Sequence, residues 1–554
     1  MVGKHRVVDY VVEHLAAQGV THLFGVGGAN IEDLYDAAHL GAVTAVLAKH
    51  EFGAASMADG YSRATSGLGV VAATSGGGAL NLVAGLGESF ASRVPVLALV
   101  GQPPSAMDGR GSFQDTSGVN GSPNAEEIFS AVSVYCRRVL VAADVVMALP
   151  EAVAAALSGG PAVLVLPKDL QQSLIEARAA VVVGPARRFD HPRAILDLLQ
   201  REPGPVVIIA GEQVARDDAR AELRDLVRAL NAVVATVPDA KDVSAGARLV
   251  TGVMGHSGVE RAVAASAVCL LVGTRLTVTA RAGLDAALDR VPVASIGSAV
   301  PYVDTTHVHS EDLRVSLAQL AVELSGRVGT MPDRLPDNVL RPPAHRGPGI
   351  RYRDAMIAVD AALPKDADVV VDAGNSGAAA IHHLPSRPSG RFLVALGMGG
   401  MGYSFGAAVG VCFARRRRTV VIAGDGSFFM HGMELHTAIQ HGLPLTLLLF
   451  NNNAHAMCVT REQLFYDDRY SYNRFTRSRL GAGLAAMFPG LPSVDVIDPT
   501  ALPDVLDYAM GHDGPAVVSI ECSADEIPPF APFLAAVEHH SHHQERKHDV
   551  AART

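Results

Sequence analysis

Short apolar runs alternate with amphipathic stretches and glycine-rich turns along most of the chain, and this alternation is the strongest constraint on its fold. The runs are rich in Val, Ala, Leu and Ile; examples are HLFGV at 22–26, PAVLVLP at 161–167, VVIIAG at 206–211, CLLVGT at 269–274 and TVVIAGDG at 419–426. Continuously apolar runs of this kind are typical of strands that are buried on both faces of a parallel sheet. The sequence therefore predicts an α/β chain built from repeated strand–helix units.

The strand-like runs fall into three blocks. A chain of 554 residues is too long for one hydrophobic core, and the usual domain size suggests three domains. The stretch 175–193 and the Pro- and Arg-rich stretch 326–351 separate the blocks. We predict an α/β fold with three doubly wound parallel-sheet domains. Their ranges are 1–185, 186–345 and 346–537, followed by a polar tail at 538–554.

Composition excludes several classes of protein. With 49% hydrophobic and 18% charged residues, most of the chain should be folded, and a net charge of −10 argues against nucleic acid as a partner. The run Arg415–Arg418 is interpreted as a solvated turn before a strand. Five cysteines without CxxC spacing argue against a disulfide framework or a zinc site. No apolar run suggests a signal peptide or a membrane span, so we expect a cytoplasmic protein.

Two short polar motifs stand at the ends of consecutive strands in the last block. Asp425 lies between Gly424 and Gly426 after one apolar run, and Asn452 lies in an Asn triplet after the next. Because parallel strands end at the same edge of a sheet, both side chains can meet at one point. Carboxylate and amide oxygens suit Mg²⁺, and the glycines let a phosphate approach the backbone. Either motif alone would also fit an unrelated turn.

Together the motifs resemble the signature of thiamine-diphosphate-dependent enzymes. The resemblance is to the acetolactate synthase, pyruvate oxidase and 2-oxoacid decarboxylase group, and most of all to carboligases like the acetolactate synthase large subunit. It implies three domains in chain order: a pyrimidine-binding domain, a central domain and a diphosphate-binding domain. It also implies that the metal is held by Asp425, Asn452 and the carbonyl of Ala454. The residues expected near the diphosphate are Gly424, Gly426 and Ser427, with Asn375 and Ser376 from the upstream segment DAGNS.

Glu51 is the candidate catalytic acid in the first block. It stands between the apolar run VTAVLA and a helix of small residues, so a glutamate that only favours a helix N-terminus is the alternative interpretation. The resemblance implies that Glu51 shares a proton with a pyrimidine nitrogen of the cofactor, helped by burial. It also places Asn81 of TSGGGALN beside the cofactor. Gly399 and Met401 of GMGGMGY belong to a segment whose bulky residue separates the two cofactor rings.

Several positions bear on the substrate. Phe113 and Gln114 resemble a Phe-Gln pair of carboligases, and Gly28 resembles a glycine turn above the thiazolium ring. Arg461 stands where acetolactate synthases carry a substrate-selecting tryptophan, near Met457, and this chain has no Trp. An arginine there suits a second anionic group, although it could also point to solvent. A solvent-facing amide is the equal alternative for Gln114. These departures suggest a specialised carboligase rather than a housekeeping enzyme.

Other functions remain open at this point. A 2-oxoacid decarboxylase that releases an aldehyde would need a proton donor, for which His431, His436 and His455 are available. A non-catalytic cofactor-binding homologue and a flavin-dependent oxidase are further alternatives. FAD in the central block is undecided, because the glycines near Gly211 and Gly273 follow strands but form no GxGxxG motif. The expected partners are a small 2-oxoacid, a carbonyl acceptor and a second copy of the chain, in a homodimer or homotetramer, without nucleic acid or membrane.

Overall fold

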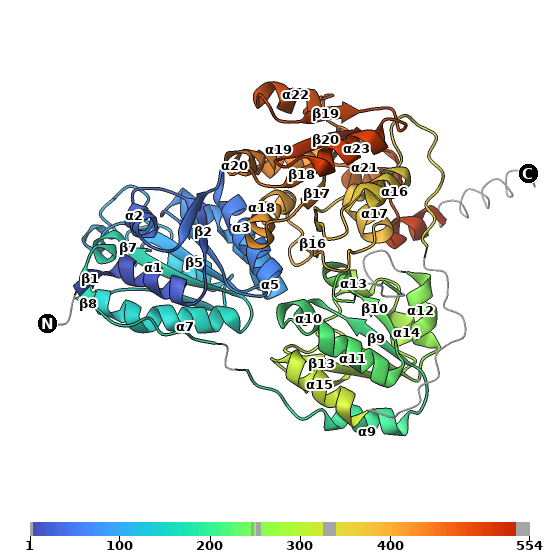
Figure 1. Ribbon diagram of the computed structural model, residues 1–554, viewed down its shortest axis with the longest axis horizontal. Helices are drawn as coiled ribbons and strands as arrows, with labels where there is room; N and C mark the ends of the chain where they lie inside the picture. Colours follow the sequence, from blue (N-terminus) through green and yellow to red (C-terminus); the bar gives the residue numbers. More distant parts are fainter. Residues whose placement is uncertain (1–3, 185–186, 245–248, 251–255, 325–338, 539–554) are drawn as a thin grey trace, which may run out of the picture.

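The computed structural model describes residues 4–184, 187–244, 249–250, 256–324 and 339–538. Within these ranges the chain forms three six-stranded parallel sheets, each flanked by helices, in three lobes that meet at the centre of the molecule (Figure 1). The predicted fold class is confirmed. The boundary at 185 and the tail from 539 onward lie outside the described residues. The boundary at 345 stays a prediction. None of the described helices is long and apolar enough to cross a bilayer.

The N-terminal sheet has the strand order β3-β2-β4-β5-β7-β6. Its strands are β2 (His22–Val26), β3 (Thr44–Leu47), β4 (Gly69–Ala73), β5 (Val96–Gln102), β6 (Tyr135–Arg138) and β7 (Pro161–Pro167), and β1 (Lys4–Arg6) pairs separately with β8 (Leu174–Glu176). The helices are α1 (Val7–Ala17), α2 (Glu32–Leu40), α3 (Glu51–Thr65), α4 (Gly77–Asn81), α5 (Val83–Ser92), α6 (Ala125–Ser130), α7 (Val145–Leu157) and α8 (Lys168–Gln171). Strands β4, β5 and β7 are fully buried, which explains their uninterrupted apolar sequences.

The central sheet has the order β11-β10-β9-β12-β13-β14. Its strands are β9 (Val206–Ala210), β10 (Val233–Thr236), β11 (Leu249–Val250), β12 (Val268–Val272), β13 (Val293–Gly297) and β14 (Thr306–His309). The helices are α9 (Arg193–Arg201), α10 (Glu212–Arg216), α11 (Arg220–Leu230), α12 (Ser257–Ala264), α13 (Val278–Arg281), α14 (Asp285–Leu288) and α15 (Leu313–Glu323). Successive strands are added on one side of β9 up to β11 and on its other side from β12 onward. The edge between β9 and β12 is therefore the switch point, where α/β sheets commonly bind ligands.

The C-terminal sheet has the order β16-β15-β17-β18-β20-β19. Its strands are β15 (Asp368–Val371), β16 (Phe392–Val394), β17 (Thr419–Gly424), β18 (Leu445–Asn451), β19 (Ser493–Val496) and β20 (Ala516–Glu521). The helices are α16 (Tyr352–Ala362), α17 (Asn375–His383), α18 (Tyr403–Arg415), α19 (Asp425–His431), α20 (Leu435–Gln440), α21 (Ala456–Tyr466), α22 (Leu480–Met487) and α23 (Leu502–Gly511). Because β17 and β18 are parallel neighbours, with Gly424 paired to Phe450, their two following turns share one edge.

Helices α3 and α18 join the N-terminal and C-terminal lobes by unusually close packing. A Cβ atom at Gly60 would lie 2.2 Å from the carbonyl oxygen of Ala407, and one at Gly410 would lie 2.0 Å from that of Met57. Only glycine permits such an approach of two backbones. The small residues of α3 therefore serve contact with α18, and they bring the start of α3 next to the loops of the C-terminal lobe.

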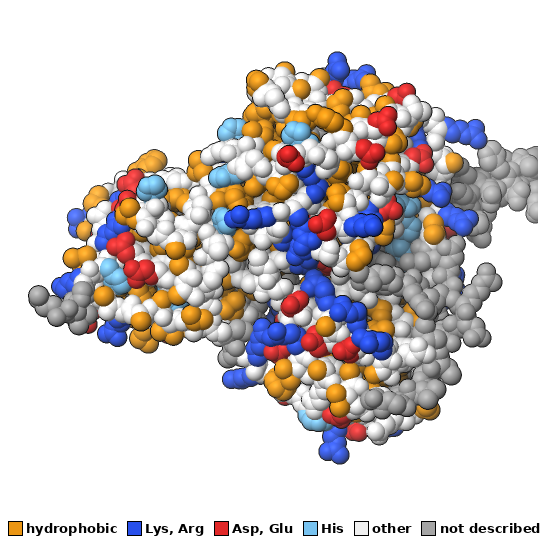
Figure 2. All heavy atoms as spheres, in the orientation of Figure 1, with side chains coloured by type: hydrophobic (Ala, Val, Ile, Leu, Met, Phe, Trp, Pro, Cys, Tyr) orange, Lys and Arg blue, Asp and Glu red, His pale blue; other side chains and the backbone are white. Residues whose placement is uncertain are grey.

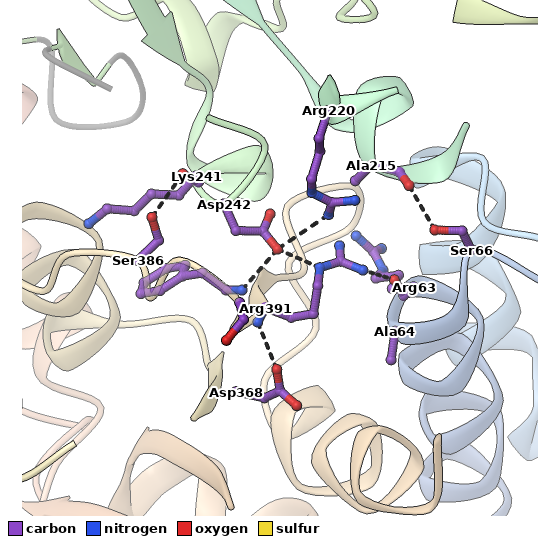
Figure 3. A network of polar contacts seen from close by, with 12 residues as sticks. Arg63, Ala64, Ser66, Ala215, Arg220, Lys241, Asp242, Asp368, Ser386 and Arg391 are labelled. Carbon is purple, nitrogen blue, oxygen red and sulfur yellow. Dashed lines mark hydrogen bonds and ion pairs between the residues drawn. The ribbon is translucent and has the colours of Figure 1, made fainter. Parts of the chain in front are cut away.

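A buried ionic network joins all three lobes where they meet. Figure 2 shows Lys, Arg, Asp and Glu side chains gathered around this junction, and Figure 3 shows the contacts inside it. The carboxylate of Asp242, after β10, accepts hydrogen bonds from the Arg391 guanidinium and from the backbone N–H of Phe392 (3.2 Å), and it pairs with Arg220 at 3.6 Å. Arg391 also donates to the carbonyl oxygen of Arg63 at the end of α3. One carboxylate thus organises contacts to both other lobes.

Replacing Asp242 by Ala is expected to destabilise the protein by about 3–5 kcal/mol, because it leaves the buried guanidinium of Arg391 without its anionic partner. Urea unfolding followed by circular dichroism measures the loss. The matched control is Asp225→Ala, which removes an exposed pair with Arg228 in the same lobe and should cost about 0–1 kcal/mol. Equal losses in the two variants would show that the network contributes no more than a surface pair.

The interpretation of Arg415–Arg418 as a solvated turn holds for Arg416, which is exposed, but not for Arg415 and Arg418, which are half-buried. The turn does precede β17, but Arg415 donates to the fully buried carboxylate of Asp368 at 2.9 Å, and Arg418 donates to the carbonyl oxygens of His512 and Gly514. A buried carboxylate such as that of Asp368, at the start of β15, needs a cationic partner. The sequence does not show that Asp368 lies next to this arginine run.

Candidate active site

The first cluster of site residues lies at the edge shared by β17 and β18. Asp425 begins α19 and is fully buried, and neither carboxylate oxygen accepts a hydrogen bond of normal geometry from the described residues. The side-chain oxygen of Asn452 is equally buried and unpaired. Burial raises the pKa of Asp425 to about 7, although the backbone N–H groups of Asn452 and Ala454 face it and lower the pKa. Three orphaned acceptor oxygens at one edge fit a hard divalent cation such as Mg²⁺.

The turn after β18 has a fixed shape that serves this edge. Asn453 adopts a left-handed conformation with φ of 53°, and its side-chain oxygen accepts the backbone N–H of Ser478 at 2.7 Å. Ala454 is buried beside the turn, and the role of its carbonyl as a metal ligand stays a prediction. The ring of His455 lies over Gly426, where an added Cβ would come within 2.5 Å of Nδ1. A Cβ at Gly424 would meet no atom closer than 4.0 Å, which leaves space beside the backbone there.

The residues expected at the diphosphate are partly engaged with the protein itself. The hydroxyl of Ser427 donates to Asp372 at 2.7 Å, so its one proton is not free for a phosphate oxygen. The side-chain amide of Asn375 donates to Thr460 at 3.2 Å. Asn375 and Ser376 are both buried in the first turn of α17. Diphosphate binding by Ser427 and Asn375 therefore stays a prediction. The groups available for it are their backbone N–H groups, which lie in the first turns of two helices.

The second cluster surrounds Glu51 at the start of α3. Glu51 is 8% exposed, and the side-chain amide of Asn81 donates to its Oε2 at 3.0 Å. A Cβ at Gly78 would lie 3.0 Å from Glu51 Oε1, so this glycine keeps the carboxylate accessible from one side. The turn of Gly28 packs on Thr74, because a Cβ added to Gly28 would lie 2.6 Å from the Cβ of Thr74. Gln114 lies against the same threonine, with a Thr74 Oγ1 to Gln114 Oε1 distance of 3.5 Å. The structure thus brings four predicted residues from distant segments together.

Glu434 and Thr74 belong to these clusters although the sequence did not single them out. The Glu434 carboxylate accepts the backbone N–H groups of Lys49 (3.0 Å) and His50 (3.1 Å), directly before Glu51. Burial raises its pKa. A glutamate in a helix gives no signal of this role in sequence, because its partners are backbone groups of another lobe. The imidazole of His431 stacks on Phe52 with ring centroids 4.3 Å apart, and burial lowers its pKa to about 4.

The remaining predicted residues are spread around the two clusters. Met401 is half-buried in a loop whose Gly399 has a φ of +65°. Met457 and Arg461 lie one turn apart on one face of α21, and the Arg461 guanidinium lies 5.7 Å from the Phe465 ring centroid. Arg461 is exposed and forms no ion pair within the part of the chain that the structure describes. Phe113 is 81% exposed.

The switch point of the central sheet is the edge at which a dinucleotide such as FAD would be expected to bind. After β9 the turn is Gly211–Glu212, and a Cβ at Gly211 would lie 2.3 Å from the Thr274 Cβ, so the turn is packed shut. Glu212 and Asp239 line the cavity at this edge. Burial raises the pKa of both carboxyl groups, and Glu212 raises that of Asp239 further, to about 7. Arg275 lines the same cavity, so this edge carries charged groups of both signs.

Comparisons with known proteins agree with this geometry. Family models described as the N-terminal TPP binding, central and C-terminal TPP binding domains of thiamine pyrophosphate enzymes match residues 5–120, 193–299 and 372–520. Acetolactate synthase isozyme 2 large subunit of Escherichia coli is 29% identical over 95% of this chain and 97% of its own. Acetolactate synthase large subunit of Parasynechococcus marenigrum is 28% identical over 94% and 88%.

A solved structure shows the same fold. It is described provisionally as a thiamin diphosphate-dependent enzyme from Mycobacterium smegmatis, with a TM-score of 0.78 and 22% identity over 94% of this chain and all of that one. Glu51 is a buried carboxyl group on the N-terminal lobe, and Asp425 leaves unpaired carboxylate oxygens on the C-terminal lobe. Together with the matched family models, the three α/β lobes define an enzyme that works with a bound diphosphate cofactor. The chain belongs to the thiamine pyrophosphate enzymes, whose family models match each of its three lobes.

Proposed function

We propose that the chain is a carboligase of the acetolactate synthase type, which decarboxylates a 2-oxoacid and joins the remaining fragment to a second carbonyl compound. Bound thiamine diphosphate supplies the electron sink for this chemistry. The protein's part is to hold the metal through Asp425, Asn452 and Ala454, and to present Glu51 as the proton-sharing acid. Asn81 orients Glu51 by its hydrogen bond. Relatives of similar length that carry the acetolactate synthase name support the proposal.

The position of Gln114 is the observation that carries the choice of carboligation. Its backbone has a φ of 62°, which is unfavourable for a residue with a side chain, and its Cβ packs within 2.6 Å of a Cβ built on Gly76. This strained conformation directs the amide toward Thr74, in the same cluster as Glu51 and Gly28. A neutral amide there can hydrogen-bond a second carbonyl compound, and it is not an acid of the kind that a simple decarboxylase needs.

Product analysis tests the proposal directly. Purified protein with thiamine diphosphate and Mg²⁺ is given a panel of 2-oxoacids with aldehyde or ketone acceptors, and products are identified by mass spectrometry. We expect ligated products, and Gln114→Ala should shift the output toward free aldehyde. Aldehyde as the sole product of the wild type would instead favour the decarboxylase, for which His455 beside Gly426 and His431 beside Gly402 are candidate donors. Oxygen consumption would favour the oxidase.

Arg461 is proposed to select an acceptor with a second anionic group. Its side chain is exposed on the same face as Met457 and has no carboxylate partner among the described residues. Arg461→Ala should raise KM for an anionic acceptor by about 10- to 100-fold and leave a neutral acceptor almost unchanged. Arg469→Ala, on the neighbouring loop, is the control. Housekeeping rates of acetolactate formation from pyruvate alone, unchanged in Arg461→Trp, would contradict this assignment.

We further propose a cytoplasmic homodimer or homotetramer, in which a second copy completes the site. Exposed apolar side chains flank both clusters, as on surfaces that bind a partner. They include Leu47, Leu80, Met398, Phe429, Met430 and Met433. Sedimentation equilibrium should give at least twice the mass of one chain, and a monomer with full activity would exclude the shared site.

The purified protein is expected to be colourless. Glu212 and Asp239 line the cavity at the switch point of the central sheet, beside Arg275, and as anions they would repel the phosphates of FAD. Absorption spectra should show no flavin band, and titration with FAD should give no heat in calorimetry. Recovery of one flavin per chain would contradict this prediction.

A further inference from the structure

The loop 397–402, which carries Met401, is held at its first half by a single carboxylate from another lobe. Three consecutive backbone N–H groups donate to Glu88 on α5: Gly397 at 3.1 Å, Met398 at 2.6 Å and Gly399 at 3.3 Å. Glu88 is 3% exposed. A carboxylate that accepts several backbone N–H groups fixes a loop more firmly than neutral acceptors do, because each hydrogen bond is charge-assisted.

The second half of the loop is held by a carboxylate from its own lobe. Asp372 accepts the backbone N–H groups of Gly402 (3.0 Å) and Ser404 (3.0 Å), together with the hydroxyl of Ser427. Met401 therefore lies between two anchors, one of which is shared with the turn that carries Asp425. Without the anchor at Glu88, only one end of the loop would be fixed.

Glu88 is itself held rigidly. It accepts the hydroxyl of Ser92 at 2.6 Å and the guanidinium of Arg63 at 3.4 Å. Arg63 donates to the buried carboxylate of Asp59 on α3 at 2.6 Å. The position of Glu88 is thus tied to α3, the helix that begins with Glu51.

We propose that Glu88 is a positioning residue that sets the 397–402 loop, and with it Met401, in the conformation that receives the cofactor. The inference rests on the proposed function for the role of Met401, but the contact between Glu88 and the loop does not. Its effect is expected in the free protein as faster loop motion, and with cofactor as weaker binding.

The test compares wild type with Glu88→Gln in two measurements. Hydrogen–deuterium exchange of the free protein should show amides of residues 397–399 exchanging about tenfold faster or more in the variant. Gln replaces one of the two acceptor oxygens by an NH₂ group, and the backbone N–H groups that faced that oxygen lose their acceptor. Calorimetric titration with thiamine diphosphate and Mg²⁺ should give a Kd raised by about tenfold. Ser92→Ala, a milder change, should move both quantities in the same direction by less.

The matched control is Asp368→Asn, which alters another buried carboxylate that accepts a backbone N–H group of the C-terminal lobe. Asp368 accepts the backbone N–H of Arg391 at 2.7 Å, at the opposite end of β16 from the loop. It should lower stability without changing loop exchange or Kd by more than about twofold. Unchanged exchange and Kd in Glu88→Gln, or equal changes in the control, would overturn the inference. A wild type that binds no thiamine diphosphate would overturn the proposed function and leave the exchange result to stand.

Discussion

Replacing Glu51 by Gln is expected to lower kcat/KM by about 10²- to 10⁴-fold while the fold is retained. Gln has the same size and can keep the contact with Asn81, but it cannot share a proton with a pyrimidine nitrogen. Because Glu51 is buried, the neutral amide should not reduce stability. Steady-state kinetics on the ligated product, with circular dichroism for folding, measure the effect.

The control for this variant is Glu32→Gln. Glu32 is also the first residue of a helix, α2, but its side chain is 65% exposed and pairs with Lys168. Both glutamates favour a helix N-terminus, and only Glu51 lies in the cluster with Gln114 and Gly28. If the two variants kept similar activity, Glu51 would be no more than a helix-start charge, and the proposed activation of the cofactor would be lost.

Replacing Asp425 by Asn is expected to abolish cation-dependent cofactor binding, with Kd raised more than about 100-fold. The free protein should at the same time become more stable, by about 1 kcal/mol or more, because the variant removes a buried carboxylate with no hydrogen-bonding partner of normal geometry. Opposite signs for free and loaded protein are the distinctive result, since loss of an ordinary structural residue would weaken both states.

Thermal unfolding with and without thiamine diphosphate and Mg²⁺ measures both effects. Wild type should gain about 2.7 kcal/mol when the cofactor is present at 100 times its Kd, and Asp425→Asn should gain nothing. Asp285→Asn is the control, since Asp285 also begins a helix but is exposed and paired with Arg281. A cofactor-induced gain in Asp425→Asn equal to that of wild type would exclude Asp425 as the metal ligand.

The metal-binding part of the candidate site could be predicted because its residues come directly after strands in the sequence. Asp425 and Asn452 each stand one or two residues beyond a continuous apolar run, and parallel pairing of neighbouring strands brings such positions to one edge. Gln114 and Asn81 could be placed only by resemblance. Nothing in their local sequence indicates that they converge on Thr74 and Glu51, because both sit in loops or short helices whose paths depend on the whole lobe.

The sequence by itself determined the three α/β lobes and the edge that carries Asp425, because strand periodicity and turn residues are local properties of the chain. Glu51 became the candidate acid only through the resemblance to a known family. Only the tertiary structure decided the carboxylates that hold these parts in place, Glu434 before Glu51 and Glu88 on the loop of Met401. Their partners are backbone N–H groups of another lobe. Every residue type except proline offers the same N–H group, so no side-chain pattern can reveal such a contact.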